Sequence, residues 1–399
     1  MGTKFVTGLA KGNSGYDVGK AAAQQALQKL DTNEINFTIV FSSSKYNYEE
    51  VIKGIREITH DAPLIGCSTA GEFTENFVEK ESIACALISS DNHKFFTGIG
   101  TGLREDEITC IREASKNFPF TVDGYPYKSY ILCEDGLCGK GEETAMAMLS
   151  VLGANMKFAG GSAGDDIKML ETKVFSDNKV LNNSLSLALI ASKKPIAIAV
   201  RHGHTPISPP LTVTKSDGNT VYEINNKPAF EIWKTYTRED AKKTLGIDVD
   251  NLQEHSENLA RFLTRYGAGL YVGDSSYKIR WAGSSVSIKG PITFTTSIPE
   301  NTVLRIMASP KEDQIASARM SAEIIKNSLK GMKLAGVIVF DCVVRAVILQ
   351  DDFKRAVNAI SEVLQAPLIG FETYGEFAME MGQMSGFHNT TTVILALPD

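Results

Sequence analysis

Residues 62–73 read APLIGCSTAGEF and residues 366–377 read APLIGFETYGEF, so nine of twelve letters match across about 300 positions. Chance does not place so long a match twice in one chain, and the two ends are therefore related units. Each copy follows an apolar run, at 37–41 and 336–340, and precedes another, at 83–89 and 391–397. The repeat predicts a unit of strand, helix, strand, glycine-acid turn and strand.

A fainter third copy lies between the two. Residues 129–133 form an apolar run, residues 141–152 have helical spacing, and FAGGSAGDD follows at 158–166. The turn of small residues followed by an acid is thus present again. We expect a chain built by duplication, with a site assembled from equivalent turns.

Composition is ordinary for a globular protein, since 43% of the 399 residues are hydrophobic and 22% are charged. Alternating helix and strand patterns predict an α/β fold with mixed sheets covered by helices. The proline-rich stretch KKPIAIAVRHGHTPISPP at 193–210 is the candidate crossover between two domains, at 1–204 and 205–399.

Charge and hydropathy exclude several classes of protein. The net charge is −6 and no basic tract occurs, which argues against nucleic-acid binding and a polybasic membrane anchor. No run approaches the roughly 18 apolar residues of a membrane span, and no signal peptide opens the chain, so we expect a cytoplasmic protein. Six scattered cysteines do not form a disulfide framework or a zinc spacing.

The glycine turns are the first candidate site. Gly71 and Gly375 permit a positive φ and close backbone approach. Glu72 and Glu376 either cap adjacent backbone or face a ligand, and both interpretations stay open. The turn hydroxyls available for hydrogen bonding are those of Ser68, Thr69 and Thr373.

The sequence supports a catalytic role of the first turn less well than a ligand-binding role. GCSTAG is not a nucleophile elbow, because two residues separate its serine from the second glycine. A hydrolase using Cys67 or Ser68 would need a base, and no histidine–acid pair can be nominated from the sequence. We therefore expect a protein without catalytic activity.

The remaining candidate ligand-binding residues are one arginine and several histidines. Arg345 follows the apolar strand of VFDCVVR and is a candidate carboxylate binder, against the alternative of a solvated or structurally paired arginine. His202 and His204 follow the strand IAIAV, and His388 opens the last strand, so each could hold iron or simply form hydrogen bonds. His60 and His93 lie in polar stretches and are expected to be exposed.

Several motifs together resemble the FIST sensory proteins, which carry an N-terminal and a C-terminal FIST domain. In the N-terminal half they are PLIGCSTAGEF (63–73), GGSAGDD (160–166) and TVTKSDGNTVYEINNKPAFEIW (212–233). In the C-terminal half they are VFDCVVR (339–345), GFETYGEF (370–377) and HNTTTV (388–393). One departure is Val344, where many members have glycine.

The resemblance implies a bacterial or archaeal signal-input protein that binds a small ligand, with amino acids as the ligands proposed for the family. It further implies that some stand-alone members bind haem b, sense nitric oxide and modulate a histidine kinase. We expect a non-catalytic sensor of this kind with a separate signalling partner, and the sequence leaves open whether it forms a homodimer. The residues expected to contact a ligand are Cys67, Ser68, Thr69, Gly71, Glu72, Gly161, Ser162, Asp165, Arg345, Thr373, Tyr374, Gly375, Glu376 and Asn389, with His204, His202 or His388 on haem iron.

Overall fold

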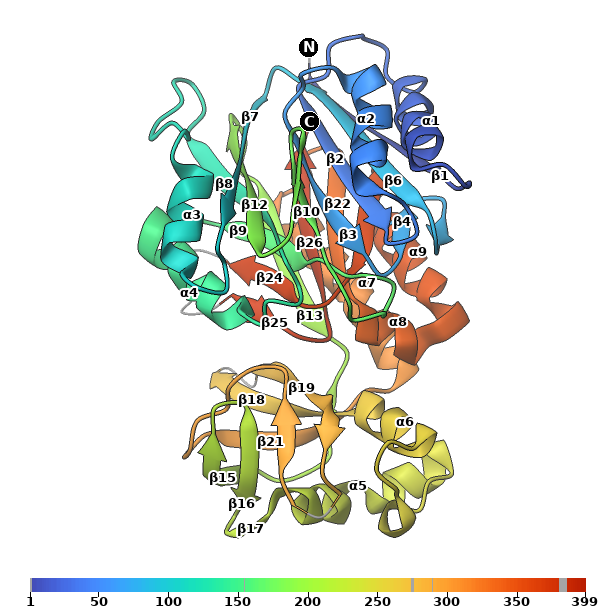
Figure 1. Ribbon diagram of the computed structural model, residues 1–399, viewed down its shortest axis with the longest axis vertical. Helices are drawn as coiled ribbons and strands as arrows, with labels where there is room; N and C mark the ends of the chain where they lie inside the picture. The colour runs from blue at the N-terminus through green and yellow to red at the C-terminus, as the bar shows by residue number, and fades with distance from the viewer. Residues whose placement is uncertain (1, 154, 274–275, 289, 380–385) are drawn as a thin grey trace.

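The molecule consists of two bodies, a larger one with three sheets and a smaller one below it (Figure 1). The computed structural model describes residues 2–153, 155–273, 276–288, 290–379 and 386–399. The chain leaves the larger body after β13 (Ala197–His202) and re-enters it at α7 (Lys311–Ser328). The domain boundary expected at 204/205 stays a prediction; in the structure the C-terminal half contributes to both bodies, because the chain returns to the larger one near residue 310.

The first repeat unit has the predicted order of elements. These are β2 (Phe37–Ser43), α2 (Tyr48–Thr59), β3 (Leu64–Thr69) and β6 (Ile83–Ser90), preceded by β1 (Thr3–Ala10) and α1 (Gly15–Leu27). β3 pairs parallel with β2 and β6 pairs antiparallel with it, giving the strand order β1-β6-β2-β3. The parallel pair is buried on both faces, which explains why its strands read as continuous apolar runs.

The other two units repeat this order as β7-β12-β8-β9 and β13-β26-β22-β23. Cys67, Gly161 and Phe371 occupy the same register position in the three parallel pairs. The predicted duplication is therefore confirmed, and it extends to three units. The remaining elements are β7 (His93–Thr101), α3 (Glu107–Ser115), β8 (Tyr127–Glu134), α4 (Gly141–Leu152), β9 (Phe158–Ser162), β12 (Ser184–Ser192), β22 (Leu334–Cys342), α8 (Val343–Leu349), η2 (Gln350–Asp352), α9 (Phe353–Leu364), β23 (Leu368–Thr373) and β26 (Thr391–Pro398).

Each unit contributes a hairpin to the sheet of a neighbouring unit. The hairpin β4 (Glu72–Thr74) and β5 (Val78–Glu79) of the first unit extends the sheet of the third, next to β23. The hairpin β10 (Val174–Ser176) and β11 (Lys179–Leu181) extends the first sheet, and β24 (Glu376–Met379) with β25 (Phe387–His388) extends the second. This cyclic exchange covers one edge of each sheet and links the three units.

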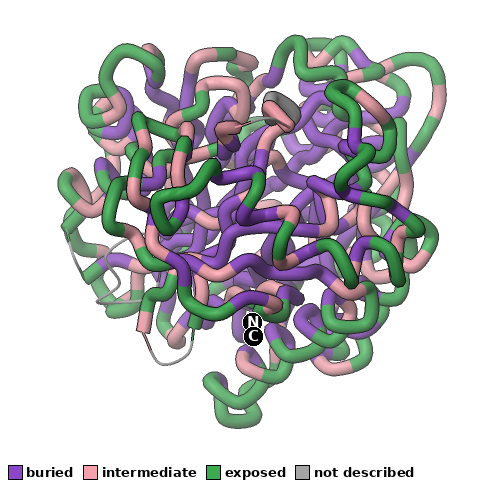
Figure 2. The backbone as a smooth tube through the Cα atoms, turned by 90° about the horizontal axis from the view of Figure 1, so that it is seen from below, coloured by how far each residue is buried: buried purple, intermediate pink, exposed green. Residues whose placement is uncertain are grey.

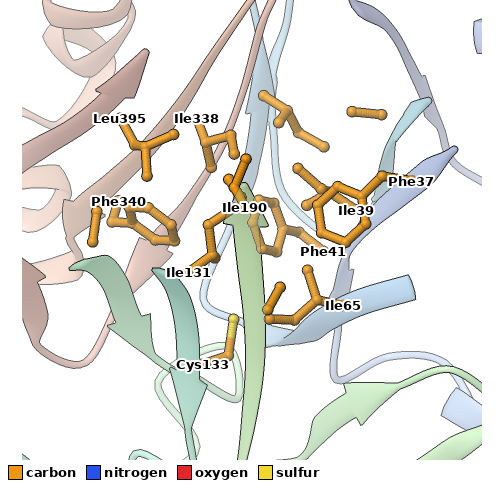
Figure 3. Close-up of a cluster of buried hydrophobic side chains, with 14 of the residues drawn as sticks. Phe37, Ile39, Phe41, Ile65, Ile131, Cys133, Ile190, Ile338, Phe340 and Leu395 are labelled. Atoms are coloured by element: carbon orange, nitrogen blue, oxygen red, sulfur yellow. The ribbon is translucent and has the colours of Figure 1, made fainter. Parts of the chain in front are cut away.

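The three sheets face one another around a shared apolar core (Figure 3). Phe41 from the first sheet and Phe371 from the third pack with tilted rings, 4.4 Å between their centroids, and Ile131 of the second sheet belongs to the same cluster. The helices pack on the outer faces, where α1 and α2 cover the first sheet, α3 and α4 the second, and α7 and α9 the third. Each sheet is thus buried on both sides.

The smaller body has its own core of aromatic side chains around Trp233, Phe262 and Phe294. β15 and β16 form a hairpin, and Gly218 in its turn has φ +54°. The helix α5 that follows runs from residue 229 to 245. The elements are β14 (Thr205–Pro206), β15 (Leu211–Asp217), β16 (Thr220–Ile224), β17 (Lys227–Pro228), α5 (Ala229–Leu245), η1 (Val249–Asn251), α6 (Glu257–Arg265), β18 (Tyr266–Gly273), β19 (Ser276–Val286), β20 (Ile292–Phe294) and β21 (Val303–Ala308).

The two ends of the chain lie side by side (Figure 2). Thr3 N donates to Asp399 Oδ1 at 2.6 Å, which ties the first strand to the last residue. The sequence analysis expected His93 to be exposed, but its side chain is fully buried, and its Nε2 lies 2.9 Å from Pro398 O. Within the described residues, none of the helices has the length and apolar character needed to cross a membrane.

Candidate ligand-binding site

The three glycine turns meet at the carboxyl ends of the parallel strands. Their backbones hydrogen-bond to one another from Ala70 N to Glu372 O (3.2 Å), Glu372 N to Gly71 O (2.8 Å), Gly164 N to Ser68 O (2.9 Å) and Ser162 N to Gly375 O (2.8 Å). We call residues 68–72, 162–165 and 372–376 the turn junction. The turns expected to share a site therefore do lie together, at the end of the sheets where α/β proteins commonly bind ligands.

Glu72 and Glu376 face the interior of the turn junction as caps. Glu72 accepts hydrogen bonds from Thr69 Oγ1 and from Ser82 N (3.2 Å), while Glu376 accepts from Thr373 Oγ1 (2.5 Å) and Thr391 N (3.0 Å). Burial raises the pKa of Glu72 to about 8 and that of Glu376 to about 7, against the lowering effect of these hydrogen bonds. Of the two interpretations left open, the structure shows the cap.

The turn glycines serve close packing. Gly71 and Gly375 do not have a positive φ, so the left-handed backbone that the sequence suggested for these two is wrong. Gly161 of the second turn does not have one either. A Cβ on Gly161 would lie 2.5 Å from Thr373 Cγ2, and one on Gly71 would lie 2.7 Å from Glu372 Oε1. The second half of the expectation, close approach of neighbouring groups, accounts for these residues.

Asp165 anchors the longer loop of the second turn. Burial alone would raise its pKa, but the hydroxyl of Tyr374 and the backbone N–H groups of residues 169–171 donate to it and lower the pKa overall. These donors occupy both of its oxygens. Asp165 and Tyr374 therefore join the second turn to the third.

The first turn does not present an open nucleophile. Cys67 is fully buried, and burial raises the pKa of its thiol well above the usual range. Ser68 is equally buried, and its Oγ accepts a hydrogen bond from Lys173 N at 2.9 Å.

Arg345 does not emerge at the strand end, and the expectation that it meets a ligand there is wrong. Its side chain is fully buried on α8. Its Nε donates to Asp341 Oδ1 at 2.7 Å and its other nitrogens donate to Gln314 and Ser317. Asp341 lies four residues earlier, so the arginine is paired structurally, as the alternative interpretation had it.

His202 and His204 lie at the end of β13, where the chain enters the smaller body. His204 N donates to His202 Nδ1 at 3.2 Å, and the two rings are 5.7 Å apart. Gln314 Nε2 lies 3.3 Å from His204 Nδ1. Burial lowers the pKa of His202 to about 4 and lowers that of His204 well below its usual value, so both are neutral at pH 7.

His388 on β25 lies near the same region. Its Nε2 is 3.3 Å from Ala378 O, which makes this nitrogen the N–H donor and leaves Nδ1 with a lone pair. Burial lowers its pKa to about 3, and the charges of Lys278 and Arg280 lower it further. Across the described part of the chain, no group of three or more histidine, cysteine, aspartate or glutamate residues is placed to hold a bare metal ion.

Two cations of the smaller body reach the larger body, and the sequence analysis missed both. Lys278 Nζ and Arg280 Nη2, both on β19, lie 3.0 Å and 3.1 Å from the same oxygen, Glu142 Oε1 on α4. Burial lowers the pKa of Lys278 to about 8, helped by Arg280 and opposed by Glu142. The available signal was YKIRWA at 277–282, where charged residues at alternate positions share one face of a strand.

Trp281, the next residue of β19, also contacts the larger body. It packs against a cluster that includes Ala70, Val343 and Tyr374. Nearby, Thr295 Oγ1 of the smaller body donates to Asn389 Oδ1 at 3.0 Å. We call Lys278, Arg280, Trp281 and Thr295, together with Glu142, Tyr374, His388 and Asn389, the inter-body surface.

The sequence of the chain matches two domain families. The FIST N domain matches residues 36–227 and the FIST C domain matches residues 229–379, and together they cover most of the chain. The chain belongs to the FIST-domain family. Membership indicates a sensory role in signal transduction.

Other similarities to this FIST-domain protein are weaker. An uncharacterized protein of Methanocaldococcus jannaschii is 25% identical over 206 residues, which are 50% of this chain and 40% of the relative. Two structures of cyanuric acid hydrolase, one of them from A. caulinodans, align with the whole chain at 8% identity, with TM-scores of 0.36 and 0.30. Scores this low carry no argument about fold or activity.

Two buried donors of the FIST-domain protein lie on β19 without an acceptor. Arg280, only 3% exposed, has no hydrogen-bond partner for its Nε among the described residues, and Trp281 has none there for its Nε1. Leaving such a group unsatisfied costs about 1–3 kcal/mol, and more for a charged group. Both residues belong to the inter-body surface, and neither nitrogen atom is exposed to solvent.

Proposed function

We propose that this FIST-domain protein is a non-catalytic sensor that binds a small carboxylate-bearing ligand at the inter-body surface. The observation that carries the proposal is the unsatisfied arginine donor on β19. Lys278 and Arg280 both contact one carboxylate oxygen of Glu142, and the Arg280 Nε has no acceptor within the described structure. A ligand carboxylate would accept a hydrogen bond from the arginine.

Binding would be converted to a signal by moving one body against the other. Glu142 belongs to the larger body and both cations belong to the smaller body, so a ligand carboxylate competes with a contact that holds the bodies together. The chain crosses between the bodies at 203–204 and 309–310, and these segments would act as the hinge. The ligand shifts the population toward the arrangement that binds it better.

Two ligand classes share this carboxylate chemistry. One is an amino-acid-like metabolite. The other is haem b, whose propionates would meet Lys278 and Arg280 while His388 Nδ1, left free by the contact of Nε2 with Ala378 O, would face the iron. When bound, haem would supply an iron centre for nitric oxide. The neutral state of His388 at pH 7 favours such ligation.

Support for a hydrolase is weaker, because Cys67 and Ser68 lie in the interior. We further propose that the output passes to a separate partner such as a histidine kinase. The movement of the smaller body would supply the change that such a partner reads.

The test begins with the absorption spectrum of the purified protein after addition of haem, and with calorimetric titration of the twenty amino acids. A stoichiometric Soret band supports haem, and binding of one amino acid supports a metabolite sensor. Arg280→Met should weaken the interaction tenfold or more, since a hydrogen bond to a charged group contributes about 1.5–3 kcal/mol. Lys215→Met, which removes an exposed cation of the same body, is the control. Failure of all these ligands to bind would refute the proposal.

A further inference from the structure

The loop at residues 166–171 displays three large apolar side chains to solvent. Ile167, Met169 and Leu170 are 53%, 61% and 80% exposed. The loop follows the second turn of the turn junction and precedes β10. Single exposed apolar residues are normal on a protein surface, whereas three within four positions form a patch of the kind that marks interaction sites.

Hydrogen bonds hold this loop in one conformation. The Asp165 carboxylate accepts from the backbone N–H groups of residues 169–171 at 2.6–3.1 Å. The Asp166 carboxylate accepts from Ser44 N at 2.8 Å, and Lys168 Nζ donates to Ser44 Oγ at 2.8 Å. Turning the apolar side chains inward would break these bonds, so their exposure is a fixed property of the fold.

The backbone of the loop is strained as well. Asp166, Ile167 and Met169 have φ values of 55°, 63° and 56°, in the left-handed region. This region is unfavourable for any residue with a Cβ, and most of all for a β-branched residue such as Ile167. Strain that persists while apolar side chains face water indicates a surface prepared for a partner.

A cavity of about 420 Å³ lies beside the loop. Lys168 and Leu170 of the loop line it, together with Tyr46, Tyr48 and Glu49 from the segment that begins α2. Its volume lies within the range of cavities that hold drug-sized molecules, so one large side chain fits inside it. The surface thus combines projecting apolar side chains with an adjacent hollow.

The charges beside the loop favour a second copy of this chain as the partner. In the part of the chain that the structure describes, Lys168 forms no ion pair and neither does Glu49, although both are exposed and line the same cavity. Glu171 and Lys173, also in its lining, pair with each other at 2.7 Å. One cation and one anion without ion-pair partners are complementary to the same surface related by a two-fold axis. A partner of a single sign would be repelled by one of the two.

We propose that two copies of this chain dock through the 166–171 loop and its cavity to form a symmetric dimer. Leu170 of each copy enters the cavity of the other and packs on Tyr48, while Lys168 pairs with the partner's Glu49. Each contact occurs twice, as two-fold symmetry requires. The loop is ordered before association, so little conformational entropy is lost on docking. The proposal does not depend on the carboxylate site.

Sedimentation equilibrium of the full-length protein over a range of concentrations measures the dissociation constant of the dimer. Leu170→Ser should raise this constant about a hundredfold, because a loss of roughly tenfold per apolar contact occurs twice. Phe120→Ser is the matched control, since Phe120 is 91% exposed and lies outside the loop. It should leave the dissociation constant unchanged.

Reversal of the two charges gives a second test that leaves the apolar contact in place. Lys168→Glu alone places two glutamates opposite each other, and Glu49→Lys alone does the same with two lysines, so each should weaken the dimer. The double variant exchanges the signs and restores the pair, and its dissociation constant should return toward that of the wild type. Circular dichroism and urea unfolding check that every variant folds.

The assignment is overturned if the wild type is a monomer at every concentration, in which case the loop serves a different protein. It is also overturned if wild type and Leu170→Ser have equal dissociation constants, since the dimer would then form through another surface. A double charge variant that dimerises no better than the single variants would show that Lys168 and Glu49 do not meet.

Discussion

Substitution of Glu142 by glutamine tests whether one carboxylate holds the two bodies together. Glu142 Oε1 accepts from both Lys278 and Arg280, whose side chains are 10% and 3% exposed. Glutamine keeps the shape and removes the negative charge that both nearly buried cations contact. Breaking a buried pair in this way costs about 3–5 kcal/mol, and because Glu142 is 33% exposed we expect the lower end, about 3 kcal/mol.

The chain contains only two tryptophans, which makes the assay direct. Trp233 lies in the core of the smaller body and Trp281 packs against the larger one. In a Trp233→Phe background, the fluorescence of Trp281 reports on the inter-body surface during urea unfolding. With a urea dependence of about 3 kcal/mol per molar, Glu142→Gln should move the Trp281 transition down by about 1 M.

The matched control is Glu143→Gln, which removes the same charge from the next, exposed position of α4. It should shift the transition by less than about 0.3 M, since exposed charges contribute little to stability. If Glu142→Gln and Glu143→Gln unfold at the same urea concentration, Glu142 does not join the bodies. The proposed competition between ligand and Glu142 would then be wrong as well.

Three further outcomes are expected. Arg345→Met should lower the free energy of unfolding by about 3 kcal/mol, because it leaves Asp341 buried without its partner; an unchanged denaturation midpoint would contradict the buried pair. Gly161→Ala should cost about 1–3 kcal/mol, because its Cβ would lie 2.5 Å from Thr373 Cγ2, and thermal unfolding measures this. Burial raises the pKa of Glu72 to about 8 from near 4.5. This residue therefore stabilises the fold fully below pH 4.5, and the stabilisation is lost as the pH rises through 8, by up to about 1.4 kcal/mol per pH unit. Glu72→Gln should flatten the pH dependence of the free energy of unfolding, measured with urea.

The repeated phrase was sufficient to predict the units but not how their hairpins pair. The apolar runs around APLIG and the spacing of the helices recur locally, so equivalence of the units could be read from letters alone. The hairpin at 72–79 could equally have extended its own sheet. Its pairing with β23 is a contact between residues about 300 positions apart, and the sequence of the hairpin does not specify which sheet it joins.

The sequence predicted that the glycine turns lie together, but not which partners their side chains have. The turns do meet, but the Glu72 carboxylate accepts hydrogen bonds from Ser82 and Thr69 of its own unit. Only the structure shows that these bonds satisfy it. For Arg345 a usable signal existed, because Asp341 lies only four residues earlier, near the end of β22, and is a carboxylate close enough along the chain to pair with it. The cations at 278 and 280 were overlooked since their strand belongs to the body without a repeat.

Function in a molecule built from three similar units should lie where the units differ. The caps Glu72 and Glu376 are repeated, and each satisfies its own turn, so they explain stability equally well in both copies. The smaller body is inserted in one unit only, between β13 and α7, and it presents Lys278 and Arg280 to the larger body beside the turn junction. Groups that merely close a repeat are expected in every copy. The positively charged surface occurs once, at the end of the sheets where the three turns converge, and the repeat does not require it. Its chemistry fits ligand recognition.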